Sequence, residues 1–187
     1  MKSPITIAVL LMASMSLYAQ PGGVYLSVAD FENGKVSYPF DCSRKSRIKL
    51  NEFLRKDFIT LIQGRESINI PRDSVFGFRD CDHKIFRIGP ENHYEILNPA
   101  EVIILYRAEE VASKSLEGWV FYFFSNTLKG KMRDLTRENL KREFPDNTKF
   151  HELLDHSFRS EHYAEYDEYH KSYKLNLIYA ESLGKKP

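Results

Sequence analysis

The chain has 187 residues, of which 42% are hydrophobic and 13% aromatic, and its 27 basic residues nearly balance its 26 acidic ones. This composition excludes global disorder, and the near-zero net charge gives no general electrostatic attraction to nucleic acid or to an anionic membrane surface. We therefore expect a folded protein with no nucleic-acid partner.

The first nineteen residues have the three parts of a secretory signal peptide. Lys2 supplies a positive n-region, residues 5–15 an apolar h-region, and Leu17-Tyr18-Ala19 a cleavage site that ends in a small residue. We expect the mature chain to begin near Gln20 and to be exported to the periplasm or the extracellular space. No cysteine closely follows the h-region, so an acylated cysteine anchor is not expected. No later apolar run reaches the roughly 18 residues of a membrane-spanning helix, so we expect no transmembrane span in the mature chain.

Residues 20–130 form short runs rich in Val, Ile, Phe and Tyr, separated by turn residues, which is typical of antiparallel strands. Gly64 between two such runs predicts a hairpin, and residues 51–56 predict a turn or a short helical piece. Together the runs predict a β-rich body, a meandering sheet that either curls into a barrel or folds into a sandwich. In chain order, the expected strands are 24–28, 35–40, 48–50, 58–62, 67–70, 75–79, 84–88, 93–97, 102–107 and 119–125.

Residues 131–187 predict about three helices that pack on this body. Thr136 can cap a helix that ends at Phe144, before Pro145. A second helix can start at Asp146 or Asn147, and a stripe of tyrosines predicts a third helix over residues 160–183. The fold class is therefore α+β, with a signal peptide at 1–19, a β-rich body at 20–130 and a helical C-terminal segment at 131–187.

The chain has two cysteines, Cys42 and Cys81, and both lie in the expected mature part. In an oxidising compartment a disulfide between them is the simplest inference, and the alternative is two buried free thiols. Closing a loop of about 40 residues stabilises the fold by about 4 kcal/mol in the chain-entropy model.

The best catalytic candidate is the segment Asp80, Cys81, Asp82 and His83, because a thiol beside an imidazole and carboxylates has the composition of a cysteine nucleophile site. The alternative is a polar turn between two strands that carries a structural cysteine. A disulfide at Cys81 would remove the resting nucleophile. The sequence favours the turn and, with it, a protein that is not an enzyme.

A basic segment follows the first cysteine, with a single acid, Glu52, among six basic residues. Such a patch could bind an anionic glycan, a lipid headgroup or a phosphate, or it could pair internally with the acidic cluster of Glu161, Glu165, Asp167 and Glu168. The patch consists of Arg44, Lys45, Arg47, Lys49, Arg55 and Lys56.

No motif predicts a metal or a cofactor. Four of the six histidines lie in the helical tail, but none is placed four residues from another, and HExxH and CxxC spacings are absent. No glycine-rich phosphate loop, GxSxG elbow or paired-carboxylate signature occurs either. We expect no cofactor and no metal site.

Several motifs resemble those of a known group of proteins. They include Gly23-Val24-Tyr25-Leu26-Ser27, Asp41-Cys42, Phe76-Gly77-Phe78-Arg79-Asp80-Cys81, Tyr94-Glu95-Ile96-Leu97 and Phe144-Pro145-Asp146-Asn147. On these motifs the chain is similar to a family of uncharacterised exported proteins of Bacteroidetes-type bacteria over nearly all of its mature part. The resemblance implies an envelope or secreted location, and it implies no activity and no catalytic residue.

The sequence thus predicts a non-enzymatic binding or structural component of the cell envelope, whose partner is an envelope protein or a glycan. The alternative is a small hydrolase or thiol-dependent enzyme that uses residues 80–83.

Overall fold

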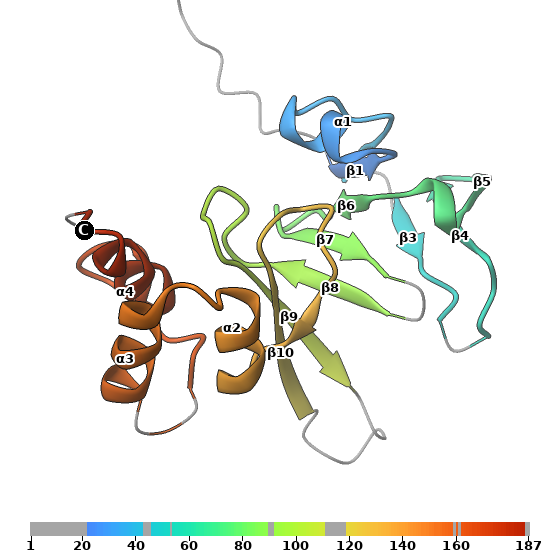
Figure 1. The fold of residues 1–187 in the computed structure, drawn as a ribbon. Coiled ribbons are helices and arrows are strands. Elements are labelled where there is room, and N and C mark those ends of the chain that lie inside the picture. Colours follow the sequence, from blue (N-terminus) through green and yellow to red (C-terminus); the bar gives the residue numbers. More distant parts are fainter. Residues whose placement is uncertain are drawn as a thin grey trace, which may run out of the picture.

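The computed structural model has an α+β fold, as the sequence predicts, with an antiparallel β-rich body followed by three helices (Figure 1). The expected signal peptide lies outside the residues that the structure describes. These described residues are 22–42, 46–52, 54–89, 92–110, 119–158, 160 and 162–185.

The larger sheet has eight antiparallel strands in the order β11-β10-β9-β8-β7-β6-β1-β2. From β6 to β11 each strand pairs with its neighbour in sequence, which confirms the predicted meander. Within the described ranges β11 and β2 are the two ends of the sheet, which is open rather than closed into a barrel. The strands are β1 (Gly22–Tyr25), β2 (Tyr38–Phe40), β6 (Gly77–Arg79), β7 (Ile85–Ile88), β8 (His93–Ile96), β9 (Ile104–Glu110), β10 (Trp119–Ser125) and β11 (Arg133–Asp134).

A smaller sheet packs on one end of the larger one, so this part of the body is a sandwich. It contains β3 (Arg47–Lys49), β4 (Phe58–Gln63) and β5 (Glu66–Pro71), followed by the 3₁₀ turn η1 (Arg72–Ser74). The predicted hairpin is confirmed, because β4 pairs with β5 through a turn in which Gly64 has φ 64°. Its core joins residues of β4 and β5 to β1, β6 and β7 and contains Val24, Phe40, Ile59, Leu61, Ile70, Val75, Phe78 and Ile88.

The strand predicted at 24–28 ends early, at Tyr25, because a short helix, α1 (Val28–Glu32), follows it. The Ser27 hydroxyl oxygen accepts a hydrogen bond from the Asp30 backbone N–H at 3.0 Å. This cap supplies an acceptor for a backbone N–H that has no partner within the helix, and it outweighs the β-propensity of Val28. The next strand likewise starts at Tyr38 rather than at Lys35.

Two of the three predicted C-terminal helices begin at their predicted caps. Helix α2 (Arg137–Glu143) starts after Thr136, whose side chain accepts from the Asn139 N–H. Helix α3 (Thr148–Ser157) starts after Asn147, whose side chain accepts from the Phe150 N–H.

The predicted third helix over residues 160–183 is wrong for its first half. The chain forms a small hairpin of β12 (Tyr166–Asp167) and β13 (Ser172–Tyr173), and only α4 (Lys174–Ser182) is helical. The Asp167 carboxylate accepts the backbone N–H groups of Tyr169 and His170, and Lys171 has φ 53°. This local turn competes with helix formation, as Asp side chains commonly do.

Helices α2, α3 and α4 cover one end of the large sheet, and the small sheet covers the other end (Figure 1). Asn176 of α4 is buried and binds both the N–H and the C=O of Ile103, each at 2.9 Å, which ties α4 to the start of β9. The core under the helices contains Ile103, Leu105, Phe124, Leu140, Phe150, Leu154, Phe158, Tyr163, Leu175 and Ile178.

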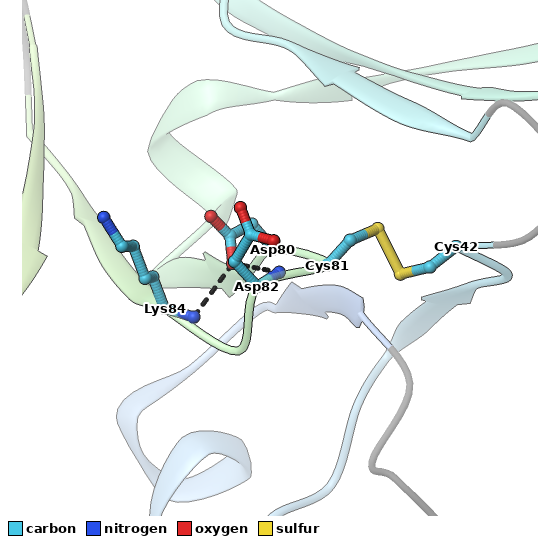
Figure 2. Close-up of a disulfide and its surroundings, with 5 residues drawn as sticks. All are labelled: Cys42, Asp80, Cys81, Asp82 and Lys84. Carbon is cyan, nitrogen blue, oxygen red and sulfur yellow. Dashed lines mark hydrogen bonds between the residues drawn. A yellow bond between two sulfur atoms is a disulfide. The ribbon is translucent and has the colours of Figure 1, made fainter.

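The predicted disulfide between Cys42 and Cys81 is present (Figure 2). It joins the residues after β2 to the turn after β6 across a separation of 39 residues. Because β1 lies between β2 and β6 in the sheet, the bond closes this end of the sheet covalently.

Replacing both Cys42 and Cys81 with Ser should lower the free energy of unfolding by about 4 kcal/mol, since the unfolded chain regains the entropy of an open loop. Urea denaturation of the wild type and the double variant measures this difference. Reductant should destabilise the wild type to a similar extent and leave the double variant unchanged. A loss below about 1 kcal/mol would contradict the proposed role of the bond.

Candidate functional site

The segment 80–83, the sequence-based catalytic candidate, forms a tight turn between β6 and β7. The Asp80 carboxylate accepts the backbone N–H groups of Asp82 at 2.9 Å and Lys84 at 2.8 Å, as Figure 2 shows. His83 is exposed and has φ 63°. Cys81 is bonded to Cys42 and therefore carries no thiol. The alternative prediction, a polar turn with a structural cysteine, describes this geometry.

The described part of the basic patch lies on the outside of the small sheet. Arg47 and Lys49 are exposed on the same face of β3, opposite Ile62 and Thr60 of β4. Arg55 and Lys56 are also exposed. Arg44 and Lys45 lie outside the described residues.

The acidic cluster that was the alternative partner of this patch forms local ion pairs. Glu165 pairs with Lys174, and Asp167 accepts from His170 at 3.1 Å. Glu168 pairs with Lys171 at 2.8 Å. Glu161, the fourth member of the acidic cluster, is outside the described residues. The four described members of the patch are therefore exposed to solvent, and no described member of the acidic cluster binds them.

A buried charge that was not predicted from the sequence joins the two sheets. The side chain of Arg72 is only 9% exposed. Its guanidinium donates to the carbonyls of Gly89 at 2.9 Å, Leu50 at 3.1 Å and Asn92 at 3.1 Å, and to the Glu52 carboxylate at 3.1 Å. The only local indication of this interaction in the sequence was Glu52, a single acid within a basic segment. Its partner Arg72 lies 20 residues away in the chain.

Glu52 also holds His93, at the start of β8. The imidazole Nδ1 lies 3.1 and 3.2 Å from the two carboxylate oxygens. Burial by itself raises the pKa of Glu52, but the hydrogen bonds and charges of His93 and Arg72 outweigh it, so the pKa lies below its ordinary value of 4.5. The carboxylate is thus held in its charged form.

A cavity of about 250 Å³ adjoins this pair. A carboxylate-bound imidazole can act as a general base when a nucleophile lies within reach. Among the described residues that line the cavity there is no Ser, Thr or Cys: they are Glu52, Asn92, His93, Ala108, Glu109, Phe121 and Phe123. The hydrogen bonds of Glu52 to Arg72 and His93 link the loop after β3 to η1 and to the start of β8.

Replacing Glu52 with Gln should lower the free energy of unfolding by about 2 kcal/mol near pH 7, because the variant loses charged hydrogen bonds to Arg72 and His93. Since folding lowers the pKa of Glu52, its contribution is present above about pH 4.5 and is lost as the pH falls through the lowered value. Urea denaturation between about pH 7 and pH 3 should show the two proteins converging.

The matched control is Glu66→Gln, at an exposed position of β5. It should change stability little at any pH in this range. A stability gap between wild type and Glu52→Gln that is the same at pH 3 as at pH 7 would contradict the linkage.

Among the described residues, the longest consecutive run of exposed large hydrophobic side chains lies on β10. The exposed fractions are 70% for Trp119, 46% for Val120, 44% for Phe121 and 39% for Tyr122. On one side, β10 pairs with β9 along its whole length. On the other side, β11 pairs only with Phe123 and Phe124, and the Leu135 N–H reaches the Tyr122 carbonyl. Among the described residues nothing pairs with the outer backbone edge at 119–121.

A groove of about 630 Å³ runs beside this edge. One wall is Val120, Phe121 and Tyr122, and the other is formed by the described part of the segment 160–165. Tyr163 fixes the second wall, because its ring is buried and its hydroxyl accepts from Arg137 Nε at 3.0 Å. The sequence correctly predicted a strand here, but it carried no signal that residues 119–121 lie beyond the part of β10 that pairs with β11.

The described residues contain no cluster of three or more His, Cys, Asp or Glu side chains that could hold a metal ion. Within the same ranges, no helix has the length and apolar character needed to cross a membrane. Comparisons of the chain with protein-family models, curated proteins and solved structures gave no significant match.

Proposed function

We propose that the protein is an exported, non-enzymatic binding component of the cell envelope that holds an extended segment of a partner protein along the edge of β10. The observation that carries the proposal is the exposed run from Trp119 to Tyr122 at an edge that β11 leaves uncovered.

The edge lacks the features that usually protect such strands. Natural proteins place charged residues, Pro or bulges on exposed edges to prevent pairing with other chains. Residues 119–124 are Trp-Val-Phe-Tyr-Phe-Phe and contain neither a charge nor a proline. Retaining an open, uncharged edge is reasonable where a partner strand occupies it.

The groove supplies the second requirement of strand addition. A bound strand gains affinity from backbone hydrogen bonds to the edge and specificity from alternate side chains that enter pockets. Here Val120 and Tyr122 point to one face of the sheet, and the groove lies between them and Tyr163. A protein partner is favoured over a glycan, because unpaired backbone groups of a strand match another peptide backbone.

The location in the periplasm or outside the cell is part of the proposal. It is supported by the signal-peptide pattern of residues 1–19 and by the disulfide, which is compatible with an oxidising compartment. Membership of a Bacteroidetes-type exported family stays a prediction. The alternative thiol enzyme is disfavoured, because Cys81 is occupied by Cys42.

Export can be tested by expressing the full chain in a bacterium and sequencing the N-terminus of the product. We expect the protein in the periplasmic or secreted fraction with a start near Gln20. A Leu11→Arg variant should keep its leader, because a charge interrupts the apolar h-region. Wild-type chain recovered in the cytosol with Met1 intact would contradict the proposal.

Partner binding can be tested by a photo-crosslinking residue at position 120 in cells that export the protein. We expect a discrete crosslinked product with another protein. The same probe at Ile68, which is 43% exposed on β5, is the matched control and should give no such product. A product that contains only two copies of this chain, or equal products at both positions, would overturn the proposal.

A substitution completes the test. Val120→Lys should reduce crosslinking from a probe at position 121 about tenfold, because pairing would have to bury the new charge. Ile68→Lys should leave it unchanged. Equal thermal unfolding of the two variants would show that the loss arises at the edge and not from misfolding.

A further inference from the structure

We propose that a groove of about 520 Å³ on the other face of the large sheet binds a small carboxylate with a ring-shaped or apolar body, and that Arg87 of β7 is its anchor. The described residues that line it include Arg87, Tyr94, Phe123, Lys131 and Met132. This site does not depend on the proposed strand-binding edge, because Phe123 and Tyr122 are adjacent in β10 and point to opposite faces.

The guanidinium of Arg87 is held in place by a chain of hydrogen bonds. Its Nη1 donates to the Tyr106 hydroxyl at 3.3 Å, and its Cζ lies 5.7 Å from the centre of the Tyr106 ring. Tyr106 is fully buried, and its hydroxyl lies 2.9 Å from Ser125 Oγ. Ser125 in turn donates to the Thr127 carbonyl at 2.7 Å, so Tyr106 donates to Ser125 and accepts from Arg87. The relay orients the arginine before any ligand arrives.

The described residues use little of the hydrogen-bonding capacity of Arg87. A guanidinium has five N–H donors, and the relay uses one of them. Among the described residues no carboxylate forms an ion pair with Arg87, although the side chain is half-buried. A charge that is partly removed from water gains from an anionic partner, and a guanidinium matches a carboxylate with two parallel hydrogen bonds.

The charges around the groove favour an anion. Lys131 is exposed at the rim and has no ion-pair partner among the described residues. Arg133 is already neutralised by Glu143 at 2.9 Å. Asp134 also lines the groove and opposes binding, but it is outnumbered by Arg87 and Lys131, which form no ion pair with any described carboxylate.

The groove walls determine the body of the ligand. The rings of Tyr94 and Phe123 meet edge to face, with their centres 5.1 Å apart. Met132 is partly buried and packs against the same hydrophobic core as these two rings. These aromatic and thioether surfaces bury apolar or ring-shaped groups. A carboxylate on such a body could come from a uronic-acid sugar or from an aromatic acid, and the two sources share the same contact with Arg87.

Calorimetric titration of the full mature chain with glucuronate and with phenylacetate distinguishes these sources. We expect saturable binding of at least one acid, and none of the neutral analogues glucose and phenylacetamide. Arg87→Gln should weaken binding about tenfold or more, and Arg87→Lys nearly as much, because a lysine cannot form the two parallel bonds. Arg65→Gln, at an exposed position of the hairpin turn between β4 and β5, is the matched control and should not change affinity.

Two further variants test the geometry. Lys131→Gln should weaken binding two- to threefold at low salt, as expected for a rim charge. Tyr106→Phe should weaken binding several-fold although residue 106 does not contact the ligand, because the variant lacks the hydroxyl that orients Arg87.

The proposal is overturned if neither acid binds saturably, if the neutral analogues bind equally well, or if a folded Arg87→Gln or Lys131→Gln protein binds like the wild type. The Val120→Lys variant should bind the acid as the wild type does. Failure of the acid-binding proposal can therefore be distinguished from failure of the strand-edge proposal.

Discussion

The hydrogen bonds of Arg72 are the interaction on which the attachment of the small sheet to the large one depends. Its acceptors come from both sides of that contact: Leu50 and Glu52 follow β3, whereas Gly89 and Asn92 lie between β7 and β8. A guanidinium that is only 9% exposed is stable in this position because hydrogen bonds replace the water it has lost. Glu52 balances the charge and extends the network to His93. The ion pair thus converts an apolar contact between two sheets into one fixed arrangement.

This arrangement explains which surfaces of the large sheet stay open. The small sheet covers the end formed by β1, β2, β6 and β7, and the helices cover the other end beside β9 and β10 (Figure 1). The helices reach Phe124, near the end of β10, whereas residues 119–122 extend beyond both them and β11. The exposed aromatic edge is therefore a consequence of how far each covering layer extends. Its exposure does not follow from the composition of the strand.

The two proposed binding features use β10 and its neighbours in different ways. The edge at residues 119–121 is proposed to offer backbone groups to a peptide, whereas the groove at Phe123 and Arg87 offers an oriented charge beside aromatic rings. Alternation of side chains along a strand separates them onto opposite faces. Neither feature requires a reactive side chain, in keeping with a turn at residues 80–83 that serves the disulfide and the Asp80 hydrogen bonds.

The sequence by itself determined the features that depend on neighbouring residues. Caps at Thr136 and Asn147, the hairpin at Gly64 and the strand positions follow from local hydrogen bonding and from period-two alternation. The disulfide followed from two cysteines in a chain that is expected to be exported to an oxidising compartment. Tertiary structure decided what depends on distant partners: the break in the tyrosine-rich segment at Asp167, the pairing of Glu52 with Arg72 and His93, the exposure of residues 119–122 and the bond from Arg87 to Tyr106. Spacing along a chain predicts local geometry, but it carries no information about which layer ends where or which buried charge finds a partner.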